Sequence, residues 1–460
     1  MRKLLKWVAC AVGAMIAVAV VLWSVARLRG PTAEQQAALA AMQAPWTPEG
    51  RNAFPYFWQL AYDVPDATQA EVAAEDLRRM AAAPPPGTDA DGSRTPGLFN
   101  YASVASQRYP DLRPSGEDHA LFCKPREPGC LQRVRADLPR YEALVDRHAR
   151  LYARVAALAD YGHYRSPLPP RFDAAMPSLQ NGSTTITQHA VAFARGDVDV
   201  ALEATCRDIA TWRRLGANSD ALIMRMVGIA YSTDGYGRLL AEMLAELPRD
   251  HPLPRSCAVA VAPAEASELR LCQAMRGEFA TSSSAIRLMR AQAATSRNPA
   301  DRALAPLFFD PEATVADIAT TFAPACSDGE LQRLATDAAQ VGWPEPRRGY
   351  WRLECVGNPV GCVLGEIARP AYRDYVLRAQ DQGARLKLLS TLLWLREQDG
   401  EGRTLEARLG ARPSALKSPT RDIEVGDDGR SLRIRQFDAG RGDDWTLPLP
   451  PYLWTAPPDA

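Results

Sequence analysis

The chain has 460 residues, of which 47% are hydrophobic and 23% are charged, so it can bury one large core or two smaller ones. Its 54 basic residues balance its 54 acidic residues, and a net charge of zero excludes the broad positive field on which nucleic-acid binding depends. The basic residues include only five lysines, a bias that together with abundant alanine and proline indicates a GC-rich bacterial genome.

The first long apolar segment covers residues 7–26 and carries no charge over about 20 positions, which matches the roughly 30 Å core of a bilayer. Basic residues precede it, and this bias predicts a cytoplasmic N-terminus. A cleavable signal peptide is the alternative, because residues 24–26 resemble a cleavage site. The length of the run and the tryptophans Trp7 and Trp23 near its ends favour an uncleaved anchor over residues 1–29.

The segment after the anchor, residues 30–50, contains a short helical pattern and a Pro-rich hinge, and we interpret it as a stalk or linker. It leads into GRNAFPYFWQLAYDVP, in which Asn52 can cap a short helix. A helix that is apolar on all sides is normally buried, so the stretch is either a core element or, because aromatic clusters also mark interfaces, a partner-binding patch. The residues of this candidate interaction patch are Phe54, Tyr56, Phe57, Trp58 and Tyr62.

Eight cysteines follow the membrane segment, and two pairs of them have the same spacing. Cys123 and Cys130 flank a loop with Pro and Gly, and so do Cys355 and Cys362, which predicts two disulfides, each next to the start of a helix. Free thiols and a zinc site are the alternatives, but the chain has no C-x-x-C motif. Disulfides require an oxidising compartment, here the periplasm. The pairing of the other four stays open, and these are Cys206, Cys257, Cys272 and Cys326.

Helical periodicity dominates the rest of the chain up to about residue 405. The clearest example, residues 138–160, has apolar residues at three- and four-residue spacing. We predict helices over residues 66–82, 138–160, 183–195, 198–215, 219–247, 264–279, 281–296, 312–321, 328–340 and 363–399.

Within this region, QHAVAFARGDVDVALEATCRDIATWRRLGAN places Gly196 between two helices and Ala201 five residues later. This stretch, about residues 188–218, resembles a TPR (tetratricopeptide) helical hairpin. The resemblance implies a fragment of an α-solenoid and a protein-binding surface, with no site residues to transfer. It lacks the expected proline after the second helix and has no second copy at the expected period, and no family is recognised for the whole chain.

The C-terminal segment, residues 406–460, has a different pattern. Apolar residues alternate about a Gly-Asp-Asp-Gly turn in RDIEVGDDGRSLRIRQFD, which predicts a β-hairpin before a Pro-rich end.

Candidate catalytic groups are few. His163 and Arg165 lie in a Tyr-rich loop, and Glu278 lies on a predicted helix, and we single out these three as a polar site. Glu268 and Glu278 lie about 15 Å apart along a helix, which is too far for a glycosidase pair. No metalloprotease or serine-hydrolase motif occurs, and we expect no metal, no cofactor and no catalytic residue that can be named from the sequence.

The sequence therefore predicts a mainly α protein with one N-terminal transmembrane helix, a multi-helix domain over residues 51–405 that takes an α-solenoid as one form, and a C-terminal β-hairpin. We expect it in the bacterial inner membrane with its domain in the periplasm. The favoured hypothesis is a scaffold, adaptor or inhibitor, with an immunity protein as one version, that binds another envelope protein. The alternative is a cell-envelope hydrolase with a site assembled from distant residues, so enzymatic activity stays undecided, with the balance against it.

Overall fold

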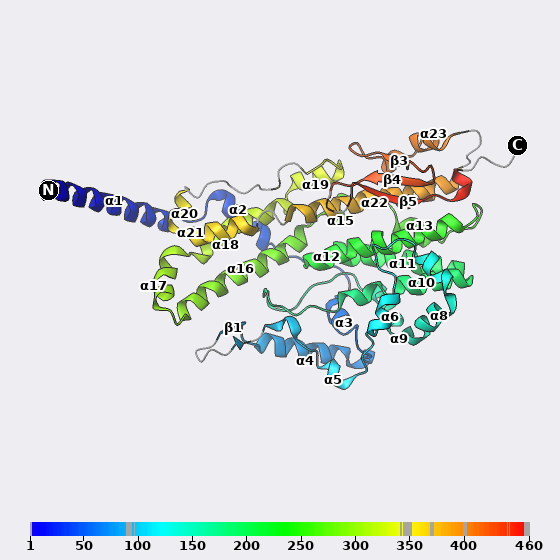
Figure 1. Ribbon diagram of the computed structural model, residues 1–460, viewed down its shortest axis with the longest axis horizontal. Coiled ribbons are helices and arrows are strands. Elements are labelled where there is room, and N and C mark those ends of the chain that lie inside the picture. The colour runs from blue at the N-terminus through cyan, green and yellow to red at the C-terminus, as the bar shows by residue number, and fades with distance from the viewer. Residues whose placement is uncertain are drawn as a thin grey trace.

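A computed structural model describes residues 2–88, 94–95, 97–340, 343, 352–368, 372–398, 403–438, 440 and 442–454. These residues form a mainly helical protein with a small antiparallel sheet near the C-terminus, which confirms the predicted fold class. Helix α1 (Arg2–Leu28) projects from one end of an elongated body, and the small sheet lies toward the other end (Figure 1). Its length and apolar composition allow it to cross a membrane.

Helix α2 (Ala33–Gln43) follows α1 after a short connection. Its first turn is closed by a capping box, in which the Thr32 side chain accepts the amide of Gln35 and the Gln35 side chain accepts the amide of Thr32. Ala38 and Met42 are buried in a hydrophobic cluster with α18 (Pro311–Phe322). The helix in the segment interpreted as a stalk therefore packs on the body of the protein.

The next part of the chain forms the lower layer of the molecule in Figure 1. The predicted helix over residues 66–82 is confirmed, as a 3-10 turn (Asp66–Thr68) followed by α4. The predicted helix over residues 138–160 is interrupted at His148, where the backbone leaves the helical conformation (φ −107°, ψ 15°) and the ring lies 2.9 Å from Asp118. The layer contains α3 (Phe54–Trp58), α4 (Gln69–Ala82), β1 (Gly87–Thr88), β2 (Arg94–Thr95), α5 (Ala105–Arg108), α6 (Gly116–Leu121), α7 (Cys130–Ala136), α8 (Leu138–Arg147) and α9 (Ala149–Ala156), with 3-10 turns at Leu98–Asn100 and Ala157–Asp160.

The centre of the molecule is built from α10 (Thr185–Arg195), α11 (Val198–Ala217), α12 (Leu222–Ile229) and α13 (Tyr236–Glu246), after a 3-10 turn at Leu179–Ser183. Gly196, at φ 101°, makes the short turn between α10 and α11, which pack against each other. Whether this pair is a TPR hairpin stays a prediction. The predicted helix over residues 219–247 begins at Leu222 and contains a π-helical segment at Ala230–Gly235, which places Asp234 against Arg385 at 3.0 Å.

The following helices connect the centre to the base of α1. The sequence predicts two helices, over residues 264–279 and 281–296. The structure instead has a short helix, α15, and one long helix, α16, so the break between the helices lies before residue 272 and not at residue 280. The elements are α14 (Arg255–Ala260), α15 (Ala266–Leu269), α16 (Cys272–Thr295), α17 (Pro299–Phe308), α18, a 3-10 turn (Ala323–Cys326) and α19 (Asp328–Ala335).

The C-terminal part contains a second long helix and the sheet. The sequence predicts one helix over residues 363–399, but the structure shows two, α21 and α22. Residues 369–371 and 399 lie outside the described part. The β-hairpin is confirmed with Ile423 opposite Ile434, and a third strand that the sequence did not predict pairs Trp445 with Ile434. The elements are α20 (Leu353–Gly357), α21 (Pro359–Ala368), α22 (Arg373–Glu397), α23 (Leu405–Gly410), β3 (Ile423–Val425), β4 (Ser431–Arg435) and β5 (Asp444–Pro448), with 3-10 turns at Ser414–Leu416 and Pro451–Leu453.

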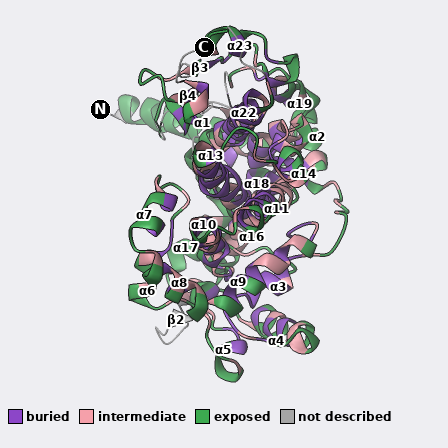
Figure 2. Cartoon of the chain, turned by 90° about the vertical axis from the view of Figure 1, so that its right-hand side faces the viewer, coloured by how far each residue is buried: buried purple, intermediate pink, exposed green. Residues whose placement is uncertain are grey.

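The C-terminal sheet is part of the main core. Ile434 and Trp445 belong to the same hydrophobic cluster as buried residues of α11, α13 and α22, and the view down the body shows buried positions concentrated around α13 and α22 (Figure 2). Arg421, whose side chain is 1% exposed, connects the start of the sheet to α22 through Asp381 and to the end of α19 through Asp337. The segments on the two sides of residue 405 therefore share one core, while the Pro-rich end over residues 455–460 lies outside the described part.

The structure contains four disulfides. The two predicted pairs, Cys123–Cys130 and Cys355–Cys362, are present with Cα atoms 5.6 Å apart. Cys130 is the first residue of α7, whereas the second pair joins α20 to α21. The open pairing is resolved as Cys206–Cys257 and Cys272–Cys326, which join α11 to α14 and the start of α16 to the turn after α18.

Candidate functional site

A cavity of about 310 Å³ opens on the lower layer, beside α3, and we call it the aromatic cavity. Segments that are far apart in sequence build it: the end of α3, the loops around residues 101–103 and 113, and residues 176–180. Its walls combine three aromatic rings with one guanidinium group, hydroxyl groups and an amide. The lining residues are Trp58, Ala61, Tyr62, Tyr101, Ser103, Arg113, Met176, Pro177, Ser178 and Gln180.

Asp76, a fully buried residue of α4, holds one wall of this cavity in place. Its carboxylate accepts hydrogen bonds from Trp58 Nε1 at 2.8 Å, from the Tyr101 hydroxyl at 2.9 Å and from the Val104 amide at 2.8 Å. The hydroxyl of Ser103 also donates to it. Burial and the bond to Asp76 raise the pKa of Tyr101, so its hydroxyl stays protonated and remains a donor. The four donors fix the two rings before any ligand arrives.

The opposite wall is more exposed. The Arg113 guanidinium lies over the Tyr62 ring, 5.6 Å from its centroid, and bonds Asp111 at 2.9 and 3.0 Å. The Arg113 side chain is 51% exposed, and Met176 at the rim is 54% exposed. A ligand can therefore reach a cation and a thioether at the rim, while the rings of Trp58 and Tyr62 in the wall are largely buried.

The five aromatic residues of the candidate interaction patch are divided between the core and this cavity. Phe54, Tyr56 and Phe57 are at most 6% exposed, and Phe57 packs edge-on against Trp212 with ring centroids 6.0 Å apart. These three residues therefore belong to the core, as the alternative interpretation of this stretch predicts, and do not form an exposed patch. Trp58 and Tyr62 are also largely buried, but they line the aromatic cavity. The predicted helix cap at Asn52 is wrong: Ala53 holds the N-cap position of α3 and makes no side-chain cap bond, and Asn52, one residue earlier, accepts the Phe54 amide at 3.1 Å.

The three residues singled out as a polar site have different partners in the structure. His163 Nδ1 lies 3.0 Å from the Glu49 carbonyl oxygen, so this nitrogen carries the proton and donates. Arg165 donates to the Trp46 carbonyl at 3.4 Å. Glu278 lies on α16, and burial raises its pKa. His163 and Arg165 thus hold the segment after α2 to the loop before residue 166, which is a structural arrangement.

The titratable group that sequence reasoning missed in this region is Asp220. Its carboxylate accepts the Ser166 amide at 3.1 and 3.2 Å in the loop that leads into α12. Burial raises its pKa to about 6. No motif marks Asp220 in the sequence, because the low-dielectric surroundings come from α16, whose Gly277 lies directly against the residue 220 carbonyl.

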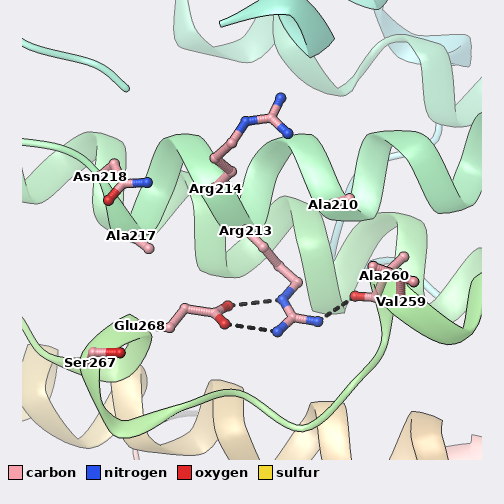
Figure 3. Close-up of a pocket in the computed structure, with 9 residues that line it drawn as sticks. All are labelled: Ala210, Arg213, Arg214, Ala217, Asn218, Val259, Ala260, Ser267 and Glu268. Carbon is pink, nitrogen blue, oxygen red and sulfur yellow. Dashed lines mark hydrogen bonds and ion pairs between the residues drawn. The ribbon is translucent and has the colours of Figure 1, made fainter. Parts of the chain in front are cut away.

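A second cavity of about 400 Å³ lies between α11 and residues 259–268 (Figure 3). Arg213 reaches into it and holds Glu268 through two bonds of 2.8 Å, while Arg214 points the other way and bonds backbone carbonyls of residues 159 and 161. Glu268, a possible catalytic carboxylate in the sequence, is therefore neutralised by its ion pair with Arg213. This arrangement holds α15 to α11 and leaves no free carboxylate at Glu268 for acid–base chemistry.

One buried cluster brings together the residue types of a hydrolase. Asp208 Oδ2 accepts from His189 Nε2 at 2.8 Å and from the Thr185 hydroxyl at 2.9 Å, and Thr185 lies 2.6 Å from the Tyr236 hydroxyl. A nucleophilic hydroxyl needs the imidazole beside it, but here the carboxylate lies between them. All four residues are at most 4% exposed, so no substrate can reach them. The cluster is a satisfied polar network of the core.

The sequence matches no protein-family model and no curated protein, and the structure matches no solved structure. Function is therefore inferred from the contacts, burial and charges of this chain. Among the geometric features above, the aromatic cavity alone combines exposed cationic and apolar groups with fixed aromatic rings, within the part of the chain that the structure describes.

Proposed function

We propose that this protein is a membrane-anchored binding protein of the bacterial envelope, which holds another envelope protein at its aromatic cavity. It acts as a scaffold, adaptor or inhibitor, and an immunity protein is one form of the last. The anchor lies in the inner membrane and the helical domain in the periplasm.

Two features support this location. Helix α1 is long and apolar enough to span a bilayer, and basic residues precede its apolar part. Four disulfides stabilise the domain, and such bonds persist in oxidising compartments. Both features favour a domain on the periplasmic side.

The observation that carries the binding role is the composition and rigidity of the aromatic cavity. Trp, Tyr and Arg are the residues that contribute most to the affinity of protein interfaces, and Trp58, Tyr62, Tyr101 and Arg113 meet in this one place. Asp76 fixes two of the rings before binding, so a partner loses little conformational freedom on the side of this protein. Asp76 already accepts four hydrogen bonds, so it is not available as a catalytic base.

The direct test is photocrosslinking in living cells. A benzophenone amino acid replaces Met176 at the rim of the cavity, or Val200 on α11, which is 66% exposed and serves as the matched control. We expect one protein to crosslink stoichiometrically from position 176 and not from position 200. Equal crosslinking from both positions, or none from position 176, contradicts the proposal.

A charge reversal then tests the cavity itself. Arg113→Glu removes the exposed cation, and Arg195→Glu is its control, because Arg195 is also exposed and also pairs with an aspartate two residues away. We expect Arg113→Glu to lower the crosslinking yield from position 176 several-fold and Arg195→Glu to leave it unchanged. An unchanged yield with Arg113→Glu shows that the partner does not use the cavity.

A further inference from the structure

The end of α1 nearest the domain is fastened to the helical body by specific contacts. Trp23 Nε1 donates to the Leu307 carbonyl at 2.8 Å, and Arg27 pairs with Asp310 at 2.7 Å. Gly357 of α20 lies so close that a Cβ there would be 2.9 Å from the Ala26 side chain. The helix and the body are therefore one packed unit at this end.

No free spacer separates the body from the membrane helix. Helix α2 turns back onto α16 and α18, where Arg276 Nε donates to the Ala41 carbonyl at 2.9 Å and Met42 is 4% exposed. The parts of the body that touch α1 thus stay at the level of its last turns.

Apolar side chains are exposed on the helices at this level. They lie at the end of the body from which α1 projects, on α17, α20 and α21 (Figure 1). On α17 they follow three- and four-residue spacing, and so do positions 360, 363 and 367 on α21, while Val356 lies on α20 before the break at Asn358. Ile367 is the most exposed of them, at 71%. The members of this surface, which we call the membrane-proximal face, are Leu304, Leu307, Phe308, Val356, Val360, Val363 and Ile367.

The depth of this face follows from its contact with α1. The apolar run of α1 ends at Ala26, and Trp23 lies three residues before that end, roughly 5 Å inside it at about 1.5 Å per residue. Tryptophan at such a place lies in the interfacial layer of a bilayer. Since Trp23 bonds the backbone of Leu307, the last turn of α17 lies at the same depth.

We propose that the membrane-proximal face is inserted into the interfacial layer of the bilayer, on the side where the domain lies, so that lipid is its partner. This inference depends on the membrane anchoring in the proposed function. Apolar helix faces bind membranes by burying about 5–10 Å into the boundary between headgroups and acyl chains, and the anchor of this chain already holds the face at that boundary. The insertion sets the tilt of the whole domain relative to the membrane.

The test uses the full-length protein in vesicles of phosphatidylcholine and phosphatidylglycerol. In a Cys10→Ser background, which removes the free cysteine of α1, Leu304→Cys on α17 is labelled with a small fluorophore. The control is Val200→Cys, an exposed apolar position on α11. Quenching by nitroxide lipids reports contact with the bilayer, quenching by iodide reports contact with water, and flotation of the vesicles reports anchoring by α1.

We expect the label at position 304 to be quenched several-fold more by nitroxide lipids than the label at position 200, and to be shielded from iodide. Equal quenching by the lipids at both positions, in protein that floats with the vesicles, overturns the inference and leaves the anchor intact. Shielding from iodide without quenching by the lipids means that protein covers the face, which also overturns it. Failure to float shows that the anchor itself is wrong.

Discussion

Replacing Asp220 by Asn tests the electrostatic description of the loop before α12. Asp220 is partly buried, its carboxylate accepts the Ser166 amide, and its pKa is raised to about 6 by burial. Asparagine has nearly the same shape and keeps an oxygen for the Ser166 amide, but it carries no charge. The substitution therefore removes the cost of ionising a buried group and little else.

The sign and size of the effect follow from linkage. The folded protein holds the Asp220 proton more tightly than the unfolded chain, whose pKa is the ordinary 3.8, so stability is lost as the pH rises from 3.8 through about 6. The difference between the two pKa values, at about 1.36 kcal/mol per pKa unit, amounts to about 3 kcal/mol. We expect Asp220→Asn to match the wild type near pH 4 and to exceed its free energy of unfolding by up to about 3 kcal/mol at pH 8.

The assay is denaturant unfolding of the full-length protein in detergent, followed by tryptophan fluorescence at pH 4 and pH 8. Asp427→Asn is the control, because the Asp427 side chain is 90% exposed in the turn between β3 and β4. If the wild type gains stability relative to Asp220→Asn between pH 4 and pH 8, the carboxylate is stabilised by its surroundings and the reasoning fails.

Three further variants and one control test the packing. Gly277→Ala places a Cβ 1.8 Å from a backbone oxygen of the loop before α12, so we expect a loss of about 1–3 kcal/mol or more, measured as a lower melting temperature. Replacing Cys206 and Cys257 together by Ala opens a cross-link between residues 51 apart, and we expect a loss of about 2–4 kcal/mol in denaturant titration. Arg421→Met leaves two buried carboxylates without their cation, so we expect the free energy of unfolding to fall by about 3–5 kcal/mol. Arg433→Met, on the exposed side of the sheet, should lower it by at most about 1 kcal/mol.

The sequence predicts elements well where local pattern and tertiary contacts agree. The helix predicted over residues 198–215 is observed as α11. It begins at the predicted residue, 198, and ends at residue 217, two residues beyond the predicted end. It fails where the structure interrupts a continuous pattern. The apolar spacing of residues 138–160 runs through His148 without a break, but the structure divides the stretch into α8 and α9 at this residue, whose ring contacts Asp118, 30 residues earlier.

The third strand shows the opposite failure, because its signal is present but ambiguous. Trp445 and Leu447 alternate with exposed residues, as a half-buried strand requires. The prolines that follow at Pro448 and Pro450 favour an extended strip outside a sheet, yet Pro448 is tolerated at the end of β5.

The aromatic cavity could not be predicted as a unit. Trp58 and Tyr62 were recognised as candidates, but Arg113 and Met176 join them from loops about 50 and 115 residues later, and no spacing rule connects them. The group that holds the wall, Asp76, lies in a helix of ordinary amphipathic pattern, so nothing in its neighbourhood distinguishes it from a surface aspartate.

The excess of arginine over lysine has a structural consequence in the fold. The last carbonyl groups of a helix have no partner within it. Arg396, which is 4% exposed, donates to four carbonyl oxygens at and beyond the end of α13. Arg412 donates to the carbonyl of residue 409 in the last turn of α23 and to that of residue 416 beyond it. A guanidinium can do this because its five donors lie in one plane, whereas an ammonium is a compact, strongly hydrated charge. Helices can therefore end inside this protein because arginine side chains, instead of water, donate hydrogen bonds to the carbonyl groups at their ends.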